Sequence, residues 1–403
     1  MNAELIRQSQ ALGPDLNSFG RRALVIGVIG IALTVLAFAT HPEQFFKSYL
    51  LAFIYWVSLS LGCLLVLMIH HLAGGRWGFA IRRLLEAGTR TLPLMFLLAV
   101  PLAFGIHELY EWSHEEVVAN DPVLQKKKDF LNPTFFIIRT VLYFAFWGSL
   151  AYFLNRWSAM QDNTDQTFPT RRMQVLSGPG VVLFVVVATF AAIDWIMSLE
   201  PHWFSTIYAA IYIIGQVLLT WAFMILIAVS LSRRAPLEAL LTNERLRDLG
   251  TLMLGFVMLW AYTSFSQLLI IWAGNLPEEI TWYYTRLKGG WQNVGYTLIL
   301  LHFALPFVLL VSSRIKARIP VLCTLAMGLI VMRLVDLFWI TAPALGKPEL
   351  TLSWMDIAIP VGFGGLWFFV FFGQLKKRSL VPLNDPRFDF EELAAESRED
   401  DHG

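Results

Sequence analysis

The chain has 403 residues, of which 56% are hydrophobic and only 15% are charged, and its mean hydropathy is +0.58. Soluble globular proteins are much more polar, so we expect an integral membrane protein. A formal net charge of +1 gives no indication of a nucleic-acid partner. Cys63 and Cys323 lie in apolar runs and do not form a zinc, iron–sulfur or haem-attachment motif, so we expect no covalently attached redox centre.

Ten windows of about 20 mostly apolar residues, the length of a helix that crosses a bilayer, predict ten transmembrane helices. The predicted spans are 22–40, 47–72, 89–106, 133–154, 177–198, 205–231, 249–274, 291–313, 319–340 and 353–374. The polar segment 1–21 precedes this membrane domain of 22–374. We expect the polar tail 375–403 to be disordered, or ordered only against a partner.

The segments between the spans alternate in charge. The basic segments are 74–83, 156–172, 232–247, 313–318 and 376–378, whereas the segments on the other side are acidic or nearly neutral. Lys126, Lys127 and Lys128 are a local exception. Because basic loops stay on the cytoplasmic side, we expect both termini in the cytoplasm, which agrees with an even number of spans.

Spans five and nine share a pattern that indicates an internal duplication. Asp194 lies seven residues before Pro201, and Asp336 lies seven residues before Pro343. A shift by four helices keeps the orientation in the membrane, so we predict two four-helix bundles, 47–198 and 205–340, with spans one and ten outside them. The alternative is a chance resemblance between aromatic-rich membrane helices.

Polar residues inside or at the rims of the spans are the candidate functional groups. An Asp or Arg near the bilayer centre costs about 2.5–3.5 kcal/mol on insertion, so it needs a partner or water and usually has a function. The candidates are His107, Glu108, Arg139, Asp194, Ser264, Gln267, His302, Arg333, Asp336 and Asp356. Together with waters, these groups predict a route for protons.

Two of the candidates share one helix face. Arg333 and Asp336 are three residues apart, which allows a charge-assisted hydrogen bond within the helix. His302 lies near the middle of its span, and histidine ordinarily titrates near neutral pH, which suits a proton carrier. The alternative is that this pair, and Arg139 with Asp194 across helices, only fix the packing.

Other polar and aromatic residues have simpler interpretations. We expect His70 and His71 to lie at the membrane surface, and Glu86 to pair with Arg90 at the start of span three. The tryptophans and tyrosines at span ends are interpreted as an interfacial aromatic belt; they include Trp56, Trp203, Trp282, Tyr283 and Trp291. A haem b site needs two histidines at matching depth, and only His302 is deep enough.

Three segments resemble one known family: "DWIMSLEPHWFSTIY" at 194–208, "NLPEEITWYYTRLKGGWQNVGYTLILLHFALPFVLLVSSRIK" at 275–316 and "WMDIAIPVGFGGLWFFVFFGQLKKRSLVPLNDPRFD" at 354–389. They are similar to the ActF subunit of the bacterial alternative complex III, a quinol:electron acceptor oxidoreductase. The likeness covers nearly the whole chain. More distantly, the chain resembles membrane subunits of the NrfD and PsrC type, which have two four-helix bundles and peripheral helices.

The resemblance implies a location and partners. It implies the bacterial inner membrane, a homologous membrane subunit (ActC), an iron–sulfur subunit (ActB), cytochromes c (ActA and ActE), small membrane subunits and in some cases a haem–copper oxidase. Menaquinol, haem c and iron–sulfur clusters are then expected in the partner subunits, and no cofactor in this chain. It also implies a possible proton route through this non-catalytic subunit.

The residues allow three alternatives to proton conduction. The first is that the chain binds a quinone itself, with His107, Arg139 and Asp194 at the outer end of the first bundle. The second is a purely structural scaffold that docks redox subunits. A secondary transporter is disfavoured because no pair of Gly- or Pro-broken helices occurs at matching positions.

Overall fold

The computed structural model describes residues 2–232, 235, 237–238, 240–347 and 349–387. In these residues the regular structure is helical, without a β-strand, and ten continuous or broken helices are long and apolar enough to cross a membrane. This confirms the predicted all-α integral membrane fold with ten spans. A helix is the natural outcome for such apolar segments, because a backbone in hydrocarbon must satisfy its N–H and C=O groups internally.

The first half of the chain forms five spans. They are α2 (Gly13–Thr40), α3 (Pro42–Ala73), α4 (Arg76–Thr89) with α5 (Leu92–Phe104), α9 (Pro133–Gln161) and α10 (Phe168–Trp195). The short elements are α1 (Asn2–Ala11), α6 (Ile106–Leu109), η1 (Glu111–Ser113), α7 (Glu115–Asn120), α8 (Pro122–Lys127) and η2 (Met197–Leu199). Local signals place the helix starts: Asn132 accepts a hydrogen bond from the Phe135 backbone N–H at 2.9 Å, and Pro133 opens α9.

The second half forms the other five spans. They are α11 (Tyr208–Leu231), α12 (Asn243–Gly274), α14 (Trp291–Thr297) continued by η3 (Leu298–Ala304) and α15 (Leu305–Val311), α17 (Ile319–Thr341) and α18 (Met355–Leu375). The short helices α13 (Pro277–Arg286) and α16 (Ser313–Lys316) lie between them. The η3 segment is a π-helix, which interrupts the α-helical bonding of the eighth span.

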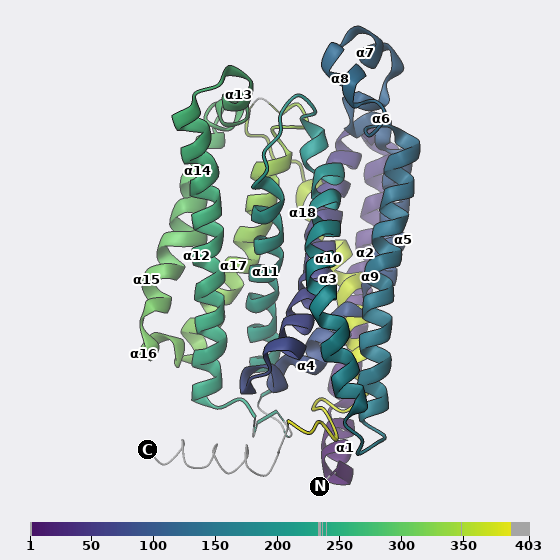
Figure 1. Cartoon of the computed structure of the whole chain (residues 1–403), viewed down its shortest axis with the longest axis vertical. Coiled ribbons are helices and arrows are strands. Elements are labelled where there is room, and N and C mark those ends of the chain that lie inside the picture. Colours follow the sequence, from purple (N-terminus) through teal and green to yellow (C-terminus); the bar gives the residue numbers. More distant parts are fainter. Residues whose placement is uncertain (1, 233–234, 236, 239, 348, 388–403) are drawn as a thin grey trace.

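The spans form two groups of four, as predicted from the repeat (Figure 1). In the first group α3 packs on α5 and α10, and α9 packs on α5 and α10. In the second, α11 packs on α12 and α17, and the η3–α15 segment packs on α12 and, through η3, on α17. This pattern repeats with a shift of four spans. The two groups meet where α3 contacts α11, and Gly62 allows this approach, because a Cβ there would lie 2.1 Å from the Thr220 hydroxyl.

The first and last spans, α2 and α18, pack against each other outside the two bundles, and α18 also covers α3. Glycines line their seam. A Cβ on Gly30 would lie 2.1 Å from Gly362 Cα, and a Cβ on Gly365 would lie 2.3 Å from Gly27 N. Small residues at such a seam let two membrane helices approach closely.

The molecule has two ends, which we name by what lies there. The terminal face carries α1 and the residues that follow α18, and the loop face carries α6–α8 and α13 (Figure 1). The segment 376–387, part of the tail that we expected to be disordered or ordered only by a partner, is placed on the terminal face of this single chain. Its Leu380, Val381 and Leu383 side chains are buried. The rest of the tail, 388–403, lies outside the described residues.

Candidate functional site

Arg333 and Asp336 form an ion pair in the second bundle, as their spacing on α17 predicted. Both side chains are buried, and Arg333 also donates a hydrogen bond to the Tyr212 carbonyl on α11 at 3.3 Å. Gly215, one turn along α11, makes room for the guanidinium, because a Cβ there would lie 2.2 Å from Arg333 Cζ. The pair therefore links α17 to the central helix α11.

Trp260 on α12 connects this pair to His302. Its indole Nε1–H donates a hydrogen bond to Asp336 Oδ2 at 3.2 Å, and the centroids of its ring and the His302 ring are 4.3 Å apart. His302 is fully buried, and neither ring nitrogen has a hydrogen-bond partner among the described residues. Since an unpaired buried polar group is costly, the imidazole has unused capacity for a proton or a water.

His302 lies in the π-helical segment η3. This segment accommodates one extra residue per turn, so its side chains point in other directions than in an α-helix. Pro306 follows η3 and has no N–H to donate back along the chain, which is consistent with the altered bonding. A π-helical turn occurs often at functional sites, and here it carries the only deep histidine of the described second bundle.

A cavity of about 750 Å³ lies in the second bundle next to these groups. Asp336 and Trp260 are part of its wall, and most of the remaining lining is aromatic or aliphatic. Its rim includes Tyr262 on α12 and Tyr296 on α14, whose side chains are 68% and 65% exposed. The cavity therefore opens on the apolar outer surface between these helices.

Three further polar groups line the same cavity. Gln267 accepts a hydrogen bond from Ser205 Oγ at 3.1 Å and donates one to the Tyr283 hydroxyl at 3.4 Å. The Ser264 hydroxyl is buried and has no partner among the described residues. Burial raises the pKa of Tyr283 to about 12, so its hydroxyl stays protonated near neutral pH. The structure thus brings Ser264, Gln267 and Asp336 around one cavity.

Asp194 has a separate set of partners in the first bundle. Arg139 binds it through two hydrogen bonds, Nε to Oδ2 at 2.7 Å and Nη2 to Oδ1 at 2.8 Å, and Tyr143 donates to Oδ2 at 2.6 Å. Arg139 also lies over the Phe130 ring, 3.9 Å from its centroid. Asp194 is fully buried, and this paired carboxylate joins α9 to α10.

The last candidates lie at the loop face. Asp356, in the first turn of α18, accepts hydrogen bonds from Ser48 at 2.5 Å and from Gln44 at 3.2 Å, and pairs with Lys347 at 3.1 Å. His107 and Glu108 on α6 are exposed. Asp356 is thus buried and paired, His107 and Glu108 are exposed, and none of the three lines the cavity of the second bundle.

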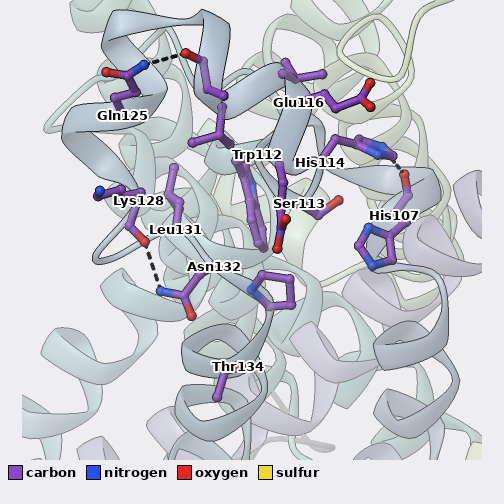
Figure 2. A pocket seen from close by; sticks show the side chains of 15 residues that line it. His107, Trp112, Ser113, His114, Glu116, Gln125, Lys128, Leu131, Asn132 and Thr134 are labelled. Carbon is purple, nitrogen blue, oxygen red and sulfur yellow. Dashed lines mark hydrogen bonds between the residues drawn. The ribbon is translucent and has the colours of Figure 1, made fainter.

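His107 lines an open pocket of about 950 Å³ beneath the α7–α8 hairpin. Figure 2 shows His107 and His114 on one side of this pocket and Lys128 and Asn132 on the other. The His114 ring nitrogen Nε2 is 2.9 Å from the His107 carbonyl, and the two ring centroids are 5.5 Å apart. These contacts stay within the loop.

A polar cluster at the terminal face was not predicted from the sequence. We define it as Arg82, Arg83 and Glu86 of α4, Ser158 and Gln161 of α9, Asp162 directly after α9, and Asp385. Glu86 pairs with Arg82 at 3.0 Å and with Arg83 at 2.8 Å. The predicted pair of Glu86 with Arg90 is therefore wrong, and Arg90 donates a hydrogen bond to Asn155 instead. The amphipathic pattern of α4 was the signal that could have revealed a buried helix here.

Two further interpretations of the sequence are wrong. His70 and His71 are buried rather than at the surface, and so are most of the residues interpreted as an aromatic belt. Trp203 stacks on Trp282 with ring centroids 5.2 Å apart, and Trp291 is fully buried. Trp56 is covered by Trp367 and Phe368 of α18, whereas Trp203 and Trp282 cover each other at the loop face.

Arg286 of α13 is another residue that the sequence did not single out. It pairs with Glu200 at 2.8 Å and donates to the carbonyl of Ile340 at 2.6 Å. It also lies over the Trp282 ring, 3.8 Å from the centroid. Arg286 therefore holds the end of α17 against the segment that joins the two bundles.

In the described part of the chain, no group of three or more His, Cys, Asp or Glu side chains could hold a metal ion. Comparison of the sequence with models of known protein families and with curated proteins found no match.

Proposed function

We propose that this chain is a membrane subunit of a quinol-oxidising respiratory complex, and that its second bundle carries protons through Asp336 and His302. The observation that carries the proposal is the contact series Arg333, Asp336, Trp260 and His302, in which Asp336 and Trp260 also line a cavity of the second bundle. Buried titratable groups next to a cavity that can admit water are the usual components of proton relays in membrane proteins.

Within this series the cavity gives the Asp336 carboxylate access to water, whereas His302 is reached through Trp260. Waters in it would reach Asp336 directly, and Ser264 and Gln267 offer further hydrogen-bonding groups on the same wall. In the first bundle the Asp194 carboxylate is fully buried and already accepts three hydrogen bonds, two from Arg139 and one from Tyr143. We therefore assign proton transfer to the second bundle and a packing role to the Asp194 pair.

The place of the chain in a complex is part of the proposal. The segment resemblance to ActF supports it, with ActC-like, ActB-like and cytochrome c partners that hold the redox groups. The basic segments between the spans support an orientation in the bacterial inner membrane with both termini in the cytoplasm. The many exposed apolar side chains on α2, α9 and α12 are available for contact with lipid or with membrane partners.

The test is to measure protons moved per electron by the purified complex in proteoliposomes. Asp336→Asn and His302→Leu are expected to lower this ratio while quinol oxidation continues. The matched control is Glu278→Gln, which removes an exposed carboxylate at the loop face. An unchanged ratio in both variants would exclude conduction through this route, and loss of the subunit from the complex would favour a purely structural scaffold.

A second candidate function is quinone binding in the second bundle. The cavity opens toward the bilayer, has an aromatic lining and holds a few hydrogen-bonding groups, which together suit a ring with a long apolar tail. This differs from the site first considered at His107, Arg139 and Asp194, because Asp194 is enclosed by its own partners.

A photoreactive quinone analogue distinguishes the two locations. Labelling of peptides from α12 or η3 is expected if the cavity is the site, and Ala261→Trp, which fills the cavity, should abolish it. Gly255→Trp is the control, because Gly255 lies on α12 with open space around it. Labelling of peptides from α9 or α10 instead would indicate that the quinone site lies in the first bundle.

A further inference from the structure

The residues after α18 cover the terminal face of the first bundle. We name 379–387 the C-terminal latch. Its apolar side chains Leu380, Val381 and Leu383 are buried, and its backbone is held from two sides. The Leu380 N–H donates to Ser9 Oγ and the Leu383 N–H donates to Asp162 Oδ1, both at 3.1 Å. The latch thus ties α1 to the end of α9.

Asp385 belongs to both the latch and the polar cluster, and it therefore joins the two. Its Oδ2 lies 2.5 Å from Arg82 Nη1, and neither side chain is exposed. Arg82 also donates to Gln161 Oε1 at 2.7 Å and pairs with Glu86. Removing either member of such a pair leaves a buried charge, so the contact holds the latch in place.

The cluster continues inward to groups that have no protein partner. His70 and His71, at the adjoining end of α3, are buried, and none of their four ring nitrogens bonds to a described residue. Arg387 of the latch donates to the His71 carbonyl at 3.4 Å. The buried Nε of Arg83 is also without a partner. Buried polar atoms of this kind are normally satisfied by internal water.

We propose that the polar cluster together with His70 and His71 forms a hydrated chamber, and that the C-terminal latch closes it. Ions buried near a membrane surface are expensive without water, and Asp385 of the latch contacts Arg82 directly. Release of the latch would open the chamber to bulk water. This inference is independent of the proton route in the second bundle, since it concerns access at the opposite half of the molecule.

The test follows water access with a cysteine reporter in the full chain in nanodiscs. Met173→Cys introduces a thiol beside Arg82, because Met173 is fully buried and its Sδ lies 3.8 Å from Arg82 Nη2. The native Cys63, buried in α3, is the internal control. Labelling by a small water-soluble methanethiosulfonate is measured for each cysteine by peptide mass spectrometry.

Two variants loosen the latch in different ways: Asp385→Asn removes its charge and Leu383→Ser removes an apolar anchor. In each variant we expect the reagent to label the introduced thiol about tenfold faster than it does with the parent latch, while the labelling rate of Cys63 stays unchanged. Asp165→Asn, an exposed carboxylate on the same face, should have no effect. Unchanged labelling in both variants would overturn the proposal, and so would equal acceleration at Cys63, which indicates general loosening.

Discussion

The indole of Trp260 donates a hydrogen bond to Asp336 across 3.2 Å while the same ring lies against His302. One aromatic side chain on α12 therefore touches the carboxylate of α17 and the imidazole of η3. Both of these groups are buried, and each comes from a different span. Trp260 fixes their relative position at the wall of the large cavity that opens on the surface of this bundle.

Replacing Trp260 by Phe keeps the ring contact but removes the hydrogen bond to the Asp336 carboxylate. We expect a loss of roughly 1.5–3 kcal/mol in stability, the usual contribution of a hydrogen bond to a charged group. The measurement is unfolding of the reconstituted protein by denaturant or heat. Trp272→Phe is the control, because Trp272 is 71% exposed. Equal losses in the two variants would show that the hydrogen bond is not important.

Arg139→Ala should destabilise the first bundle strongly, because it leaves the Asp194 carboxylate buried without its cation. The expected loss is roughly 3–5 kcal/mol. Tyr143→Phe removes only one of the three hydrogen bonds to Asp194, so its loss should be smaller, about 1.5–3 kcal/mol. The two are compared in the same unfolding assay. If Tyr143→Phe costs as much as Arg139→Ala, the ion pair does not carry the packing role.

Gly30→Leu should separate α2 from α18, since even a Cβ at this position would lie 2.1 Å from Gly362 Cα. We expect a clear fall in the melting temperature and greater protease access to α2. Gly255→Ala, at an open position on α12, should be neutral or stabilising by up to about 1 kcal/mol. A tolerated Gly30→Leu would mean that the seam is loosely packed.

Arg286→Gln should destabilise the loop face of the second bundle. It breaks the pair with Glu200 and weakens the hydrogen bond to the Ile340 carbonyl at the end of α17. We expect a loss of about 2 kcal/mol, below that of a fully enclosed pair because Glu200 is partly exposed. The measurement is thermal unfolding, and Lys288→Gln, at an exposed position, is the control. Similar melting temperatures for Arg286→Gln and Lys288→Gln would contradict a stabilising role of Arg286.

The latch should remain closed from pH 8 to pH 5 and loosen only in acid. Burial alone would raise the pKa of Asp385, but Arg82 and Arg387 outweigh it and hold the pKa below its ordinary value of 3.8. A carboxyl with a lowered native pKa stabilises the fold above its unfolded pKa, and this contribution is lost as the pH falls through the native pKa.

Hydrogen exchange of the latch amides, corrected for the intrinsic effect of pH, measures this loss. Burial raises the pKa of Asp162, so the Leu383 amide bonded to it should lose protection first as the pH falls. In Asp385→Asn the acid transition that belongs to Asp385 should be missing. Loss of protection across the whole latch between pH 7 and pH 5 would contradict the assignment of Asp385.

The sequence was sufficient for features that depend on local patterns. Apolar windows identify the ten spans because hydrocarbon selects for length and composition, and the shared Asp–Pro spacing identifies the two bundles. The Arg333–Asp336 pair was also predictable, since three residues separate its members on one helix. None of these local patterns predicts the tilt of the spans, their exact ends or the π-helical turn at His302.

The tertiary structure alone decided which polar groups meet across helices. Trp260 and Asp336 are 76 residues apart, and Arg82 and Asp385 are 303 apart. Helical periodicity tells which side chains share a face of one helix, but all faces of a buried membrane helix are apolar, so it does not tell which neighbour each face meets. That choice depends on how ten helices pack together, and it is what places Asp336 at a cavity and Asp385 over a buried arginine.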